Sequence, residues 1–196
     1  MSIAERFKIF GVKQALKYVE KDYEHNAVRL SGLAVLFCAI ISKTKGEIFM
    51  QFRRFGNKYF VRIDKGEEIM AMLKKFCQDE KITLAEVKAL GAIDDFDVGL
   101  FDVKEKKYHR NHFQFPAEIT SLWGTVTTQN GEIYLHIHMS AGDSEGKVFG
   151  GHLNSAVVSA TCEMIIDDVS ENNTNGFKVE RKFSEDVGLN LFEFVD

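Results

Sequence analysis

From Glu47 onward, short runs that mix apolar and polar residues follow one another with only brief polar turns between them. Such runs, where they alternate with a period of two, are typical of strands that bury one face. Turns this short permit antiparallel pairing, whereas parallel strands need long crossover connections. The pattern therefore predicts one twisted, mainly antiparallel sheet. The runs are 47–55, 59–63, 84–93, 95–102, 106–115, 118–128, 132–141, 147–153, 156–167 and 177–183.

One helix is expected within this series, over residues 66–80. Ile69, Met72, Leu73 and Phe76 recur at helical spacing, and two glutamates precede them at the end where carboxylates complement the helix dipole. The expected fold class is therefore α+β, a twisted sheet with one packed helix, plus an N-terminal helical appendage.

The appendage is expected because the pattern changes near Met50. Residues 1–24 resemble an amphipathic helix, and residues 30–41 form an apolar run. A helix that spans a membrane needs roughly 20 apolar residues, so this run is too short. We therefore expect an N-terminal helical and apolar extension over 1–49, a domain over 50–196, and no membrane association.

Charge and cysteine content restrict the partners and the compartment. The formal charge is −4 and the isoelectric point is about 5.9, so a nucleic-acid surface would have to be local. The three cysteines are odd in number and form no CxxC pair, which indicates a reducing, cytoplasmic setting. Two basic clusters are candidate DNA contacts or ordinary solvated surface: Arg53, Arg54, Lys58, Arg62 and Lys65, and Lys104, Lys106, Lys107 and Arg110.

The histidines carry the strongest chemical signal. His136 and His138 occupy alternate positions of one expected strand, so their side chains leave the same face. If runs 132–141 and 147–153 fold about Ser144, His152 lies directly opposite His136 and Gly150 opposite His138; a bulge at Gly150 and Gly151 could shift this register. Three imidazoles with an open fourth position suit a divalent metal, zinc first. The alternative is a strand face whose histidines merely pack or bind water.

Several spaced motifs resemble one known family, the plant-and-prokaryote-conserved (PPC) domain. They include Glu118–Gly124, His136-Ile137-His138, Gly150-Gly151-His152-Leu153 and Thr161–Ile165, within a similarity that runs from about Met50 to Phe183. The resemblance implies a mixed α+β fold, a homotrimer, and metal ligands at His136, His138 and His152. In plants this domain accompanies AT-hook DNA-binding motifs, and this sequence has no such motif.

Three functions remain open from the sequence. The first is a DNA-binding or regulatory protein, which the family and the basic clusters favour. The second is a metal-dependent enzyme on a small molecule, for which Glu118 and Glu163 are the candidate catalytic carboxylates. The third is an assembly in which the metal only stabilises the structure.

Overall fold

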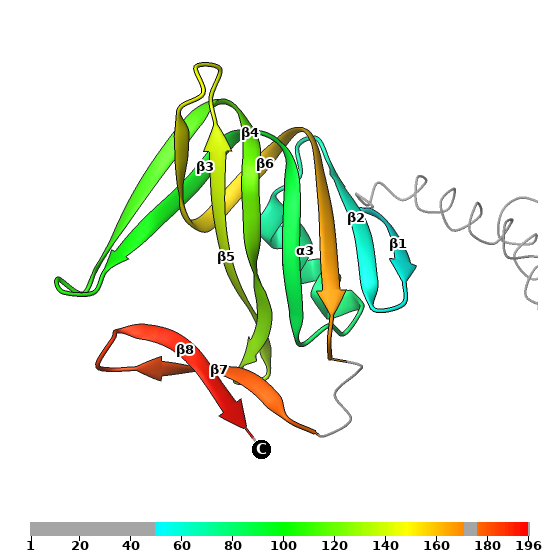
Figure 1. Ribbon diagram of the computed structural model, residues 1–196, viewed down its shortest axis with the longest axis vertical. Helices are drawn as coiled ribbons and strands as arrows, with labels where there is room; N and C mark the ends of the chain where they lie inside the picture. Colours follow the sequence, from blue (N-terminus) through cyan, green and yellow to red (C-terminus); the bar gives the residue numbers. More distant parts are fainter. Residues whose placement is uncertain (1–49, 171–175, 196) are drawn as a thin grey trace, which may run out of the picture. The chain divides into compact units, whose positions relative to one another are not determined.

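The structure is a computed structural model and describes residues 50–170 and 176–195. Its strands belong to one eight-stranded sheet, and its helix is the only one among these residues. Figure 1 labels the elements. They are β1 (Gln51–Phe55), β2 (Lys58–Asp64), α3 (Ile69–Asp79), β3 (Ala85–Asp102), β4 (Lys107–Gln129), β5 (Glu132–Gly142), β6 (Val148–Asp168), β7 (Lys178–Ser184) and β8 (Leu189–Val195).

Four of the strands close into a ring. β3 pairs with both β4 and β6, and β5 also pairs with both β4 and β6, each time antiparallel. Closure leaves these strands without a free edge along the paired stretch. Four phenylalanines pack against one another at this part of the core: Phe96, Phe113, Phe115 and Phe149.

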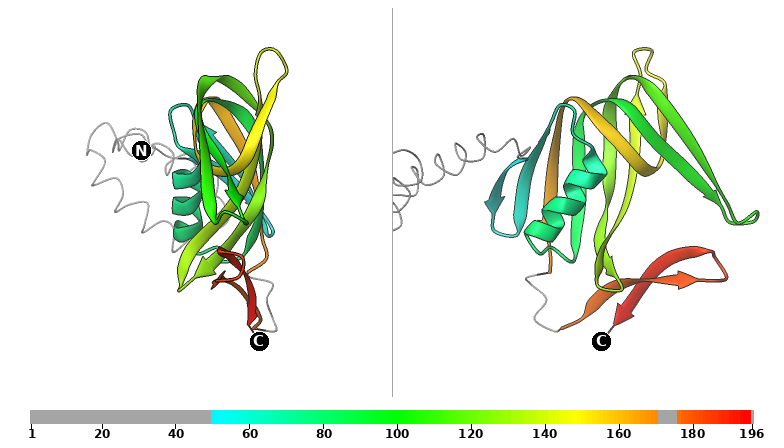
Figure 2. Two further views of the ribbon diagram at one scale, coloured as in Figure 1. Left: turned by 90° about the vertical axis from the view of Figure 1, so that its left-hand side faces the viewer. Right: turned by 180° about the vertical axis from the view of Figure 1, so that it is seen from behind.

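The helix covers the sheet from one side (Figure 2). Ile69, Leu73, Phe76 and Cys77 are buried on it, and the Phe76 ring meets the Tyr59 ring of β2 edge-on at 5.3 Å. The expected α+β class with one packed helix is therefore confirmed. The expected N-terminal appendage over 1–49 lies outside the described residues.

Three strands are longer than the sequence runs suggested. β3, β4 and β6 each join two expected runs, because register shifts bend the strands without ending them. Pro116 lies inside β4, beside the shift between Ile93 and Asp95. Proline lacks a donor for the ladder, so a position beside an irregularity is where a strand tolerates it.

The turns follow the residue types that the sequence supplies. Asn130 and Gly131, between β4 and β5, have φ of 52° and 83°. Two left-handed residues in a row suit a tight hairpin turn between twisted strands. The shortest connections in the sheet are therefore encoded locally.

The last two strands, β7 and β8, form a hairpin at the C-terminal end of the described residues. It follows the strand series as a red and orange ribbon beside the end of β4 (Figure 1). Thr128 of β4 pairs with Glu180 of β7 in parallel, while β7 and β8 pair antiparallel. β7 was expected, but β8 was not, although its residues Leu189–Val195 include five apolar ones.

The two cysteines within the described residues are free and buried, as expected for small core residues. Burial raises the pKa of both thiols, Cys77 and Cys162, to about 12. They are therefore protonated and poor nucleophiles at neutral pH. Within the same part of the chain, no helix is long and apolar enough to cross a membrane.

Candidate metal centre

The sheet gathers His136, His138 and His152 at one place on its outer surface. The first two are alternate residues of β5, and the third comes from the neighbouring strand β6. Their ring centroids are 5.1 to 5.5 Å apart, and one nitrogen from each ring lies within 4.8 Å of the other two. Three imidazoles thus face one small volume.

The register that brings them together differs from the one expected. His152 pairs with His138 and not with His136, and Gly150 pairs with Ser140. The loop between β5 and β6 is centred on Glu145 rather than on Ser144, which moves the partner of His152 by two residues. The Asp143 carboxylate holds this loop, since it accepts hydrogen bonds from the backbone N–H groups of Glu145 and Lys147. A bulge at Gly150 and Gly151, which the sequence left possible, does not interrupt this ladder.

The surroundings of His136 and His152 favour the neutral form of the imidazole. Burial, followed by the charges of Arg181 and the other two histidines, lowers the pKa of His136 to about 4. Burial also lowers the pKa of His152, with His138 adding to the effect. Only a deprotonated ring nitrogen can bind a metal, so these surroundings favour the ligand form.

Aromatic side chains border the three histidines. The Tyr108 ring meets the His152 ring edge-on at 6.4 Å, and the Tyr108 hydroxyl accepts a hydrogen bond from Asn154 Nδ2 at 2.7 Å. On the other side Trp123 pairs with His138 across the β4–β5 ladder and donates its Nε1–H to Glu86 at 2.7 Å. These contacts fix the walls around the candidate centre.

The donor set fits a divalent transition metal. In a tetrahedral zinc site the metal–nitrogen bonds are about 2.0–2.1 Å, which places ligand nitrogens roughly 3.4 Å apart. Nitrogens already within 4.8 Å reach that spacing by small rotations about the side-chain bonds. Three histidines leave one coordination position open for another ligand.

The two candidate catalytic carboxylates lie apart from this group. Glu118 pairs with Gly142, four cross-strand pairs beyond the pair of Trp123 with His138. Glu163 lies eleven residues beyond His152 on β6 and pairs with Arg62 of β2. Both are exposed, and neither joins the group of possible metal ligands.

The two histidines of β4, His109 and His112, are exposed, as expected from the sequence. His112 lies 3.3 Å from Asp97, measured from Nδ1 to a carboxylate oxygen. His109 forms a possible ligand group with Asp102 and Glu105 at the β3–β4 turn. The Asp102 carboxylate already accepts the backbone N–H groups of Lys104 and Glu105, so it serves the turn.

Both predicted basic clusters are partly neutralised. Lys58 bonds to Asp167, Arg62 to Asp64 at 2.8 Å, and Arg110 to Asp97 at 2.6 Å. Each pair removes a positive charge from the surface that phosphates would meet. Three of the nine basic residues are therefore paired with carboxylates.

Sequence reasoning did not identify Arg181 of β7. Its guanidinium donates to the hydroxyls of Thr125 and Thr127, and Thr125 is the cross-strand partner of His136. No pattern in the sequence predicts this contact, because it depends on the pairing of β7 with β4.

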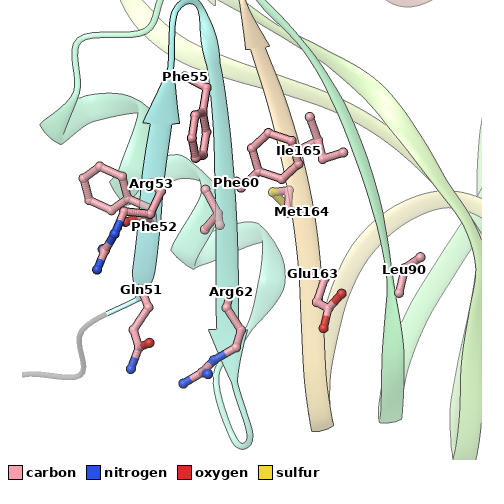
Figure 3. Close-up of a pocket in the computed structure, with 11 residues that line it drawn as sticks. Gln51, Phe52, Arg53, Phe55, Phe60, Arg62, Leu90, Glu163, Met164 and Ile165 are labelled. Carbon is pink, nitrogen blue, oxygen red and sulfur yellow. The ribbon is translucent and has the colours of Figure 1, made fainter.

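An apolar groove lies elsewhere on the sheet, along β1, β2 and β6 (Figure 3). Its volume is about 660 Å³. Phe55, Phe60 and Leu90 line it and are 64%, 48% and 59% exposed. None of its lining residues is a histidine, so it is separate from the candidate metal centre.

The fold and the three histidines together define a class: small α+β proteins with a closed four-strand ring and a candidate metal centre on it. Comparison with known proteins agrees with this class. The family model of the Plants and Prokaryotes Conserved (PCC) domain matches residues 50–170, and no curated protein matches the chain. The chain therefore belongs to the plant-and-prokaryote-conserved family, as its motifs suggested.

Solved structures are similar over most of the chain. A candidate DNA-binding protein from Bacteroides thetaiotaomicron is 32% identical, with a TM-score of 0.69 over 74% of this chain and 97% of its own. A metal-containing protein from Archaeoglobus fulgidus is 30% identical, with a TM-score of 0.62 over 74% and 98%. A PPC protein from Pyrococcus horikoshii is 31% identical, with a TM-score of 0.62 over 76% and 96%.

Proposed function

We propose that this protein binds one divalent metal ion, zinc by preference, through His136, His138 and His152. The observation that carries the proposal is that nitrogens of three half-buried or exposed imidazoles lie within 4.8 Å of one another. The metal content of the Archaeoglobus protein, 30% identical, supports it.

The residues around the centre favour ligand binding over hydrolysis. When bound to three histidines, zinc can lower the pKa of a coordinated water to about 7. A hydrolase also needs a general base within reach, and neither Glu118 nor Glu163 lies beside the histidines. The site is therefore best described as a place where a metal holds a further ligand or stabilises the ring of strands.

Elemental analysis of the purified full chain tests the proposal. We expect about one zinc per chain in the wild type, and strong loss of the metal in His152→Ala because two histidines rarely hold zinc alone. His112→Ala is the matched control, since His112 is an exposed histidine on β4 outside the group. Equal metal content in wild type and His152→Ala would contradict the proposal.

A DNA-associated role is the second candidate. It is supported by the Bacteroides protein, a candidate DNA-binding protein at 32% identity. Because acidic partners neutralise Lys58, Arg62 and Arg110, fewer cations are left to meet phosphates, so we expect any affinity for duplex DNA to be weak and to decrease as the salt concentration rises. Fluorescence anisotropy at 50 and about 200 mM salt measures this, and binding that is absent at both concentrations rejects the role.

We further propose that the protein assembles as a homotrimer in which the apolar groove meets another copy. An exposed apolar surface of this kind marks an interface more often than a free surface. The rim carries Arg53 and Glu163, so it offers both signs of charge to an identical partner. Among the strands of residues 50–170 and 176–195, β1 is also an edge strand of the sheet, and edge strands can pair with another chain.

A further inference from the structure

Arg181 is a buried cation whose bonded partners are all neutral. The residue is 8% exposed. Its Nε donates to Thr127 Oγ1 at 3.2 Å, its Nη2 to Thr125 Oγ1 at 3.0 Å, and its Nη1 to the Asn190 carbonyl at 3.3 Å. Its Cζ lies 4.1 Å from the centre of the Phe192 ring, which covers the guanidinium.

The charge of Arg181 has no carboxylate partner among residues 50–170 and 176–195. None of the ion pairs in this part of the chain includes it. Glu86 of β3 pairs with Thr125, but its carboxylate is already bonded to Lys88 and Trp123. A buried charge without a counter-charge is unfavourable, so an anionic oxygen would be stabilised at this position.

The guanidinium lies beside the candidate metal centre. Thr125 and Thr127 of β4 pair with His136 and Tyr134 of β5, so these four side chains share the sheet face that carries the histidines. Arg181 bonds to both threonines, and its Cζ is 5.3 Å from the centre of the Tyr134 ring. The cation is therefore about one cross-strand pair away from His136.

Guanidinium has five N–H donors, and the three hydrogen bonds above leave two. Planar donors of this kind match the oxygens of carboxylate and phosphate groups. A metal on three histidines adds a second positive charge and an open coordination position nearby. Both features attract the same ligand, one with at least two anionic oxygens.

We propose that Arg181 and the three histidines form one binding site for a small oxyanion, a carboxylate or phosphate group. One ligand oxygen would occupy the open position of the metal and another would meet Arg181. The proposal rests on the proposed metal binding. It gives a role to the β7–β8 hairpin, which lies beyond the residues 50–170 that the family model matches.

The test uses the full chain loaded with cobalt(II), whose visible absorption reports on the ligands of the ion. Inorganic phosphate and acetate are titrated separately, so that the two sources of oxyanion are distinguished. We expect one or both to change the spectrum of the wild type with saturation. In Arg181→Met the same anion should bind about tenfold or more weakly, because a charged hydrogen bond is lost.

Two further variants make the result decisive. Arg62→Met removes an exposed arginine of β2 that is bonded to Asp64, so its anion affinity should equal that of the wild type. Arg181→Lys keeps the charge but not the planar donors, and is expected to bind several-fold more weakly. If thermal unfolding shows that Arg181→Met does not fold, Arg181→Lys takes its place in the test.

The outcomes separate the two proposals. A wild type that takes up no cobalt rejects the metal centre itself. Wild type and Arg181 variants that take up cobalt equally and bind the anion equally overturn the role of Arg181, which then only fastens the β7–β8 hairpin. Absence of any spectral change with either anion in cobalt-loaded wild type also overturns it.

Discussion

The position of each histidine within the ladder decides whether the three rings can meet. His136 and His138 are two residues apart on β5, and His152 is paired directly with His138. Even separations keep side chains on one face of a sheet, and an odd shift would move His152 to the other. The expected register was wrong by two residues, and the expected grouping still held because two is even.

At the same scale, Asp97 on the outer face of β3 ties three strands together. Its carboxylate accepts from Arg110 of β4 at 2.6 Å and from Ser155 of β6 at 3.0 Å. These bonds, that of Arg110 first, lower the pKa of Asp97 below its ordinary value. The charged form is therefore the one that the fold stabilises.

We predict that Asp97→Asn destabilises the protein by about 1 kcal/mol at pH 7, less than a fully buried charged hydrogen bond contributes, because the Arg110 partner is largely exposed. A carboxyl whose pKa is lowered on folding adds stability above its unfolded pKa of about 3.9 and loses it as pH falls through the folded value. Urea unfolding of both proteins from pH 7 to 3 should thus show curves that converge at acid pH. A difference that is constant across this range would contradict the assignment.

At the scale of elements, the Glu68 side chain bonds the start of the helix to the strand β6. The Glu68 carboxylate accepts from the backbone N–H groups of Met70 and Ala71 in the first turn of α3. It also accepts from the N–H of Ala156 on β6 at 3.0 Å. The cap of the helix is therefore also a bond between the helix and the ring of strands.

Glu68→Ala should accordingly lower the free energy of unfolding by more than the loss of an ordinary helix cap does, which is about 1 kcal/mol. It leaves the N–H of Ala156 without its partner as well, so we expect a loss of about 2 kcal/mol or more in urea unfolding. Glu80→Ala is the control, because Glu80 caps the other end of α3 through its backbone N–H and needs no side chain to do so. Equal losses in the two variants would refute this account.

How much of the fold the sequence reveals also depends on the element. The tight turn at Asn130 and Gly131 and the helix at Ile69–Asp79 follow from local residue types, so they could be predicted. The joining of runs into long bent strands could not, because the shifts near Gly91 and Asp95 depend on partners far along the chain. Arg181 was missed for the same reason, since a single parallel pair brings β7 to β4.

At the scale of the whole molecule, the groove along β1, β2 and β6 gathers several exposed apolar side chains in one place. Phe60 of β2 pairs with Ile165 of β6, and Leu90 of β3 lies opposite Glu163 in the same sheet. Their side chains share one face, opposite the buried Val61 and Met164. Three neighbouring strands thus form one continuous apolar surface, the one that the proposed trimer would bury.

We predict that Phe60→Lys converts the proposed trimer into a monomer, because lysine in an apolar contact must be desolvated without a partner. Light scattering on the purified full chain should give three times 22.3 kDa for the wild type and 22.3 kDa for the variant. Phe194→Lys replaces a phenylalanine of β8 that is 76% exposed, more than Phe60, and lies outside the groove, so this variant should keep the wild-type mass. A wild type that is already monomeric rejects the trimer, whereas a trimer in both variants places the interface on another surface.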